Sequence, residues 1–343
     1  MSDPFDALLL VSFGGPECRE DVMPFLENVT RGKNVPQKRL LEVAEHYDHF
    51  GGASPINRQN RELMAALRSE LEDHGPHLPI YWGNRNWHPL IPDVIRQMRD
   101  DGVRRALAFV TSAFSSYSGC RQYREDIERA RTEVGLDAPP VEKLRPFFNH
   151  PGFIEAVVDR VQEALALVSR HRGSEMHLVF TAHSIPTAMA SGCRYAEQLR
   201  EVCSLVADRV GRLAWTLTYQ SRSGSPSQPW LEPDIGDWLR DFAQRGERTS
   251  IVVVPIGFIS DHVEILFDLD HEARSIANAC GLQMVRAGTV GTHPRFVRMI
   301  RELISERING LPPQSLGELG PNPDVCPENC CPSGRLALPN TVT

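Results

Sequence analysis

The feature that most constrains the fold is an alternation of short apolar runs with longer segments of helical periodicity. It continues through most of the 343 residues. The apolar runs have the length and composition of buried strands. They are 7–11, 80–82, 106–110, 177–181, 214–217 and 250–255. The predicted helices are 59–74, 92–101, 121–133, 153–169, 197–210, 235–244, 263–279 and 295–308. Strands that alternate with helices at this spacing predict an α/β fold, with parallel sheets covered by helices on both faces.

The length of the chain suits two domains of ordinary size. A Pro-rich apolar segment, residues 137–151, lies near the middle, and a strand followed by a loop opens each part. These transitions are LLLVSFGGP in the first part and LVFTAHSIPT in the second. We therefore predict two similar α/β domains, residues 1–145 and 146–310. Residues 311–343 have no periodicity, and we expect a C-terminal extension organised by its cysteines.

Composition excludes several classes of protein. Hydrophobic residues make up 41% of the chain, so a core of normal size can form, and general disorder is excluded. The net charge is −7 without a long basic run, which argues against nucleic acid as the main partner. No stretch approaches the roughly 20 apolar residues that span a bilayer. The N-terminal residues lack the basic region of a signal peptide. We expect a cytoplasmic protein without a transmembrane segment.

Candidate catalytic residues follow the predicted strands, because ligands bind beyond the carboxyl ends of strands in an open parallel sheet. Gly14, Gly15 and Pro16 follow the first strand, but they do not form GxGxxG, which favours a tight turn over a dinucleotide site. His183 follows the strand 177–181 and precedes Pro186. This position predicts an imidazole that points into a crevice, with a hydrogen-bonded structural histidine as the alternative.

A line of carboxylates lies in the segment 261–272. In a helix, Glu264, Asp268 and Glu272 fall at i, i+4 and i+8 and share one face. Like charges at this spacing destabilise a helix unless a cation or water lies between them. The residues between them are mostly apolar, which favours a buried helix and a cation path over a solvated acidic face. Imidazole with carboxylate suits divalent iron, and zinc or cobalt nearly as well.

At these residues the sequence resembles the ferrochelatases, which insert ferrous iron into a porphyrin. The resemblance extends from about residue 8 to about residue 308. It is carried by LLLVSFGGPE, FLENVTRG, HYDHFGGASPIN, YWGNRNWHP, TSAFSSYSGCRQY, KLRPFFNHP, TAHSIPT, YQSRSGSPSQPWLEP and PIGFISDHVEILFDLDHE. It implies two similar Rossmann-like domains of the chelatase type. Short motifs of zinc hydrolases, serine hydrolases and P-loop proteins are absent from the sequence.

The resemblance implies roles for the histidine and the carboxylates. His183 matches the active-site histidine that binds iron or accepts pyrrole protons, and Glu264 matches the carboxylate that faces it. Asp268 and Glu272 match the acidic line that delivers metal or removes protons. Metallation removes two pyrrole protons and strips water from iron. We therefore expect His183 and Glu264 to act from opposing sides of the ring, across a slot wide enough for a tetrapyrrole.

The resemblance also implies residues that hold the porphyrin. Ser54 and Tyr123 match positions that contact it, its propionates included. Arg31 is a further candidate, because a propionate needs a charge-assisted donor. Phe13 stands where some Gram-positive relatives carry a tyrosine that approaches the metal, so an axial phenolate is not expected here.

The C-terminal cysteines form C-x3-C-C, which is Cys326, Cys330 and Cys331. In a reducing compartment such a group favours metal over a disulfide. Some ferrochelatases, including those of actinobacteria and animals, hold a 2Fe-2S cluster through three C-terminal cysteines and one internal cysteine. The resemblance therefore implies a 2Fe-2S cluster, for which four thiolates are a normal ligand set. Cys193 is the expected fourth ligand and Cys120 its rival. The alternative is a disordered, partly oxidised tail.

Four functions are compared. The first is insertion of Fe2+ into coproporphyrin III to give coprohaem, favoured because FGGPE, FLENVTRG and NRNW resemble actinobacterial sequences. The second is the same reaction on protoporphyrin IX. The third is a non-catalytic tetrapyrrole or metal carrier, which needs no base opposite a carboxylate, so His183 together with Glu264 counts against it. The fourth is cobalt insertion into a corrin precursor, which the YQSRSG and FGGASPIN motifs disfavour. An iron donor and a coprohaem-receiving enzyme are the expected partners of the first function.

Overall fold

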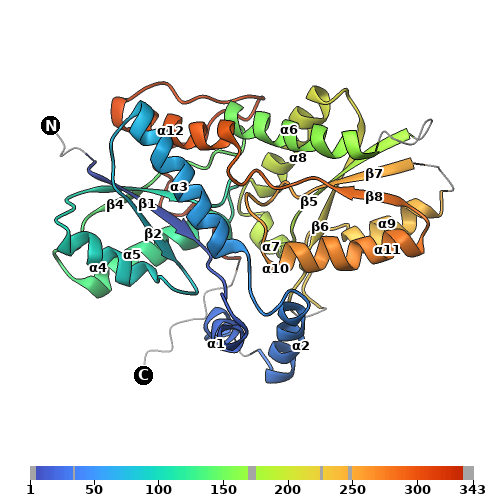
Figure 1. The fold of residues 1–343 in the computed structure, drawn as a ribbon, viewed down its shortest axis with the longest axis horizontal. Helices are drawn as coiled ribbons and strands as arrows, with labels where there is room; N and C mark the ends of the chain where they lie inside the picture. The colour runs from blue at the N-terminus through green and yellow to red at the C-terminus, as the bar shows by residue number, and fades with distance from the viewer. Residues whose placement is uncertain (1–4, 34, 169–174, 225–226, 246–248, 335–343) are drawn as a thin grey trace.

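The computed structural model describes residues 5–33, 35–168, 175–224, 227–245 and 249–334 (Figure 1). It contains two four-stranded sheets whose strands are all parallel, with helices packed on both faces. The predicted α/β class is therefore confirmed. No helix within the described ranges is long and apolar enough to cross a lipid bilayer.

The two sheets have the same strand arrangement. In the first the order is β2-β1-β3-β4, and in the second it is β6-β5-β7-β8. The strands are β1 (Ala7–Ser12), β2 (Ile80–Asn84), β3 (Ala106–Val110), β4 (Val141–Lys143), β5 (Glu175–His183), β6 (Ala214–Gln220), β7 (Thr249–Val254) and β8 (Gln283–Arg286). The first strand of each sheet pairs on both sides, β1 with β2 and β3, and β5 with β6 and β7. Every β1 side chain is buried, as expected for a central parallel strand.

Helices account for most of the remaining chain. They are α1 (Arg19–Thr30), α2 (Gln37–Asp48), α3 (Ile56–His74), α4 (Ile91–Asp100), α5 (Gln122–Val134), α6 (Pro151–Val168), α7 (Thr187–Ala190), α8 (Tyr195–Arg209), α9 (Ile235–Ala243), α10 (Val263–Ile265), α11 (Arg274–Ala279) and α12 (Pro294–Asn309), with π-helical segments η1 (Tyr117–Arg121) and η2 (Leu266–Ala273). Leu8 and Leu10 of β1 pack in the cluster that contains α3, α6 and α12, whereas Leu9 and Val11 face α4 and α5. This alternation buries both faces of the sheet.

One hydrophobic cluster runs through both halves of the molecule. It joins Phe109 of β3 to Phe180 of β5 through α6 and α12. Helix α12 packs against both α3 and α6, so the last helix closes over the junction of the halves. The helix predicted at 295–308 is therefore present, and it ties together the parts that precede it.

Besides the four-residue helix α7 and the π-helical segment η1, four elements were not predicted from the sequence. Strands β4 and β8 have only three and four residues, and β4 lies inside the Pro-rich segment that we took as a boundary. Helices α1 and α2 form a pair beneath the two sheets (Figure 1). Their small core consists of Val22, Phe25, Leu26 and Leu40. With so few buried apolar residues, α1 and α2 show little helical periodicity in the sequence, and for this reason they were not predicted.

After α12 the chain crosses back over the molecule. Asn149 Nδ2 donates to the carbonyl oxygens of Leu316 and Gly320, both at 2.9 Å. A carboxylate oxygen of Glu201 accepts from the amides of Glu318 and Leu319, at 2.6 and 2.8 Å. These bonds hold the extension against α8 and the start of α6, and they lead its cysteines toward η1.

Candidate active site

The first candidate residue, His183, is the last residue of β5. Its Nδ1 donates to the carbonyl oxygen of Ser184, and its own carbonyl oxygen accepts from the Tyr195 hydroxyl at 3.0 Å. The loop after β7 approaches closely, because a Cβ on Gly257 would lie 2.8 Å from the Cα of Ala182. The backbone and the ring of His183 are thus both held in place, and Nε2 is the ring nitrogen that can contact another side chain.

That partner is Glu264 of α10. His183 Nε2 and Glu264 Oε1 lie 3.2 Å apart, and the side chains are 36% and 42% exposed. The expectation that they face each other across a tetrapyrrole-wide slot is therefore wrong. The reason is the sheet order. Because β5 and β7 are neighbours, residues that follow their carboxyl ends lie side by side. The imidazole of His183 and the carboxylate of Glu264 are therefore in contact with each other, and both are partly exposed to solvent.

The pair is electrostatically coupled. Burial lowers the pKa of His183, but the charge of Glu264 outweighs it and raises the pKa to about 9. Burial raises the pKa of Glu264, but the His183 charge and hydrogen bond lower it to about 2. At neutral pH the unit is therefore an imidazolium–carboxylate pair. A metal ion that binds both atoms must displace the proton between them.

The acidic line continues along the predicted helix, which forms as α10, η2 and α11. Its middle is π-helical, a form that is frequent at functional sites. Asp268 accepts hydrogen bonds from the Ser221 hydroxyl and from Gln220 Nε2, the latter at 3.3 Å. Burial and the Glu264 charge raise the pKa of Asp268 to about 7. Asp268 can therefore exchange a proton near neutrality.

The outer end of this line is Glu272. Burial and the charge of Asp234 raise its pKa. Together with Asp234 and His271 it lines an open cavity of about 390 Å³. The three predicted carboxylates thus lead from His183 to the surface, as the i, i+4, i+8 spacing indicates.

Two further residues lie beside Glu264 and were not singled out from the sequence. His262 Nδ1 is 3.8 Å from Glu264 Oε2. Burial and the charge of Glu264 raise the pKa of Tyr47, which comes from α2. Both residues lie within quoted motifs, SDHVE and HYDHFGG. Tyr47 was missed because α2 itself was not predicted.

The residues expected to hold a porphyrin belong to the first half. Ser54 is buried against the loop after β1, where its amide donates to Pro16 at 2.8 Å. Tyr123 is buried, and the guanidinium of Arg85 lies 4.6 Å from its ring centroid. Arg31 is an exposed residue at the end of α1. Among the described residues, no hydrogen bond, ion pair or ring contact joins these side chains directly to the His183–Glu264 pair.

Arg85 is the residue that sequence reasoning missed in this group. Its Nε forms an ion pair with Asp126 at 2.5 Å, and the side chains are 9% and 7% exposed. Its guanidinium also lies 5.9 Å from the ring of Phe13, which is partly exposed. Arg85 thus connects the loop after β1 with α5. The NRNW motif contains it, but no spacing rule distinguishes it from a surface arginine.

The coupling of His183 and Glu264 gives a first prediction. In Glu264→Gln we expect the pKa of His183 to fall from about 9 to its ordinary 6.5 or below, because burial then acts without the main opposing charge. An NMR titration of the His183 ring measures this shift, with exposed His74 as an internal reference. An unchanged His183 titration in the variant would show that Glu264 is not the cause.

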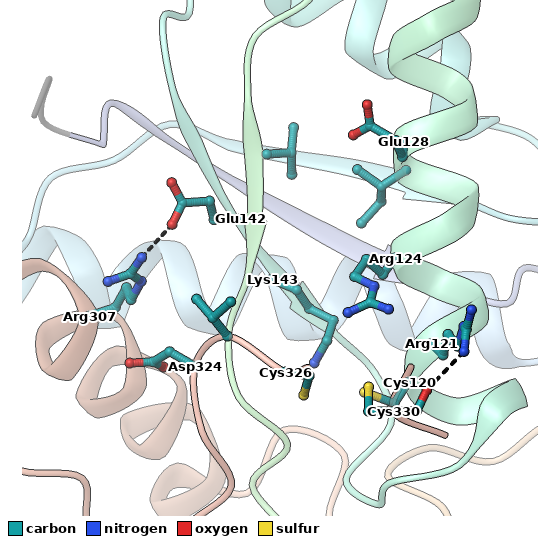
Figure 2. Close-up of a pocket in the computed structure, with 13 residues that line it drawn as sticks. Cys120, Arg121, Arg124, Glu128, Glu142, Lys143, Arg307, Asp324, Cys326 and Cys330 are labelled. Atoms are coloured by element: carbon teal, nitrogen blue, oxygen red, sulfur yellow. Dashed lines mark hydrogen bonds and ion pairs between the residues drawn. The ribbon is translucent and has the colours of Figure 1, made fainter. Parts of the chain in front are cut away.

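A second group of residues gathers where the C-terminal extension meets η1 (Figure 2). Cys120, which is 3% exposed, lines a cavity of about 240 Å³ together with Cys326 and Cys330. A hydrogen bond with Cys326 lowers the pKa of Cys120 to about 6, against the opposing effect of burial. Burial and the charge of Cys120 raise the pKa of Cys331 to about 12. The extension thus brings three thiols to Cys120.

Cys193 lies close to this group but is turned toward its own loop. Its Sγ is 3.3 Å from the carbonyl oxygen of Met189, and burial raises its pKa. Across the ranges that the structure describes, no group of three or more His, Cys, Asp or Glu side chains is arranged to hold a metal ion.

Comparisons with known proteins agree with this architecture. A family model described as Ferrochelatase matches residues 5–308. The chain is 58% identical to a Rhodopirellula baltica protein named Ferrochelatase, over 96% of this chain and 93% of that one. It is 48% identical to a Streptomyces coelicolor protein named Coproporphyrin III ferrochelatase, over 97% and 94%. Among solved structures, SirB from Bacillus subtilis with Fe3+ has a TM-score of 0.54 at 11% identity and covers 88% of this chain and 97% of its own, which shows a shared fold.

Proposed function

Because the chain belongs to the ferrochelatase family, we propose that it inserts Fe2+ into coproporphyrin III and so forms coprohaem during haem biosynthesis. It is a metal chelatase, a lyase. The observation that carries the proposal is the direct contact of His183 with Glu264 at the carboxyl end of β5. The choice of substrate rests on relatives named for coproporphyrin III, at 48% and 50% identity.

In the proposed mechanism the pair deals with both the protons and the metal. Insertion releases two pyrrole protons for each Fe2+ that enters the ring. Nε2 and the Glu264 carboxylate bind Fe2+ after the proton between them has left, and once the iron has passed to the ring the freed Nε2 accepts one of the pyrrole protons. Asp268, with a pKa of about 7, passes protons toward Glu272 and the surface. Base and metal ligand work from one side of the macrocycle.

The first half supplies the proposed porphyrin contacts. Ser54 and Tyr123 lie around the loop after β1, and Arg85 stacks between Tyr123 and Phe13. Arg31 has no carboxylate within ion-pair distance in the described part of the chain, so its guanidinium is available to a propionate. We also expect an iron donor and a coprohaem-receiving enzyme as partners, and a cytoplasmic location.

An anaerobic assay tests the choice of substrate. Ferrous iron is mixed with coproporphyrin III or with protoporphyrin IX, and the metallated product is followed by absorption. We expect faster turnover of coproporphyrin III. A preference for protoporphyrin IX would favour the second function, and tight porphyrin binding without turnover would favour a carrier.

We further propose that the cysteine group holds a 2Fe-2S cluster. Cys326, Cys330 and Cys331 supply three thiolates, and Cys120 supplies the fourth in preference to Cys193. Two facts support Cys120. It shares its cavity with Cys326 and Cys330, and its thiol is hydrogen-bonded to Cys326. When bound, such a cluster supplies a one-electron redox centre.

Two serine variants distinguish the candidate fourth ligands. We expect Cys120→Ser to lose the visible absorption and the electron paramagnetic resonance signal of the cluster. Cys193→Ser is the matched control and should keep both, because its Sγ faces the Met189 carbonyl. Protein purified under anaerobic conditions is compared. The opposite result would assign the ligand to Cys193, and a colourless wild-type protein would refute the cluster without affecting the chelatase.

A further inference from the structure

Two cationic side chains point at the cysteine group (Figure 2). Lys143, at the end of β4, donates from Nζ to the carbonyl oxygen of Leu144 at 2.9 Å. Arg124 of α5 donates to the carbonyl oxygen of Glu328 at 3.2 Å. Among the described residues, neither has a carboxylate within ion-pair distance. The charge of Lys143 acts on both Cys120 and Cys326.

The other charges of the cavity are largely matched. They form the ion pairs Arg121–Glu125 at 2.7 Å, Glu128–Arg131 at 2.7 Å, and Arg307–Glu142. Asp324 is exposed and lies on the Arg307 side of the cavity (Figure 2). The thiols therefore face an excess of positive charge on the side of Lys143 and Arg124.

Lys143 is half-buried, and its ammonium group contacts the Leu144 carbonyl oxygen and the Cys120 thiol but no carboxylate among the described residues, so it loses hydration without gaining the charge of a carboxylate. An anionic group in the cavity restores that balance. Thiolates that ligate two iron ions and two sulfides leave a net negative charge on the centre, and each added electron increases it.

We propose that Lys143, assisted by Arg124, is the counter-charge of the cysteine centre and sets its reduction potential. This inference rests on the proposed cluster and adds to it a role for two residues that do not ligate. The reduction potential of a cluster depends on local charge and hydrogen bonds. A cation near the thiolates stabilises the more negative, reduced form, so its removal makes reduction less favourable.

The test is a redox titration of cluster-loaded protein, followed by electron paramagnetic resonance with dithionite as the reductant. In Lys143→Met we expect the one-electron reduction equilibrium to become roughly tenfold less favourable, which is about 59 mV lower. Lys143→Arg should restore most of the wild-type value, since it keeps the charge. Lys38→Met, the same change at an exposed site on α2, is the control and should leave the potential unchanged.

The outcomes separate this inference from the cluster itself. If wild-type protein and Lys143→Met carry clusters of equal potential, the inference is overturned and the cluster stands. If Lys143→Arg behaves like Lys143→Met, charge is not the cause, and the inference is also overturned. A folded Lys143→Met protein that takes up no cluster, while Lys143→Arg does, supports it. Wild-type protein without any cluster after anaerobic reconstitution overturns both.

Discussion

Replacing His183 with alanine should lower the rate of Fe2+ insertion by about 10²–10⁴-fold, the range that a positioned base contributes. The change removes the imidazole that contacts Glu264 Oε1 and that serves, in the proposed mechanism, as both base and metal ligand. Porphyrin binding should survive, because the proposed porphyrin contacts belong to the first half. Turnover is measured under anaerobic conditions, and binding by quenching of porphyrin fluorescence.

His74→Ala is the matched control for this experiment. His74 is an exposed residue at the end of α3, so its removal should leave the rate unchanged. Undiminished turnover in His183→Ala would remove the histidine from the mechanism. Loss of porphyrin binding together with turnover would instead assign it a role in holding the ring.

Replacing Arg145 with methionine should lower the free energy of unfolding by about 3–5 kcal/mol, as expected when one partner of a buried ion pair is removed. Arg145 and Glu306 are 3% and 7% exposed. Arg145 donates to both carboxylate oxygens of Glu306, at 2.9 and 3.1 Å, and to the Gln314 carbonyl oxygen at 2.8 Å. The pair therefore fixes α12 and the start of the extension, and its loss leaves a buried carboxylate without its arginine.

Chemical denaturation measures this loss, and Arg39→Met is the control. Arg39 pairs with Glu42 on the surface, where an ion pair contributes about 1 kcal/mol or less. A loss in Arg145→Met no larger than in the control would contradict the prediction.

The wild-type pair of Arg145 and Glu306 also implies that stability depends on pH. Burial raises the pKa of Glu306, but His150 and Arg145 lower it from 4.5 to about 2, so its contribution is present above pH 4.5 and is lost as the pH falls toward 2.

The strands and long helices were predictable because each carries its own periodic signal. The apolar run 106–110 forms β3 with the same bounds, and the helix predicted at 295–308 extends by one residue at each end. Both elements bury most of their apolar positions, so pattern and structure agree. Helices α1 and α2 lack such a pattern, since only four of their residues form their small core.

The fourth cysteine shows a different limit of sequence reasoning. From the sequence, Cys193 was the expected fourth ligand and Cys120 its rival. In the structure Cys120 is the buried residue of the π-helical segment η1, and it lines the same cavity as Cys326. No distance along the chain reveals this, because the extension reaches Cys120 only after it has crossed both halves.

The chain's local patterns by themselves determined the α/β class, the two parallel sheets, and the positions of His183 and the acidic line. These properties depend on periodicity and on strand ends, which neighbouring residues encode. Only the tertiary structure decided that His183 and Glu264 touch on one side, and that Lys143 faces the cysteines. Those contacts depend on which strands are neighbours in each sheet and on the path of the extension. They are properties of the packed chain, because residues far apart in sequence must meet before either contact exists.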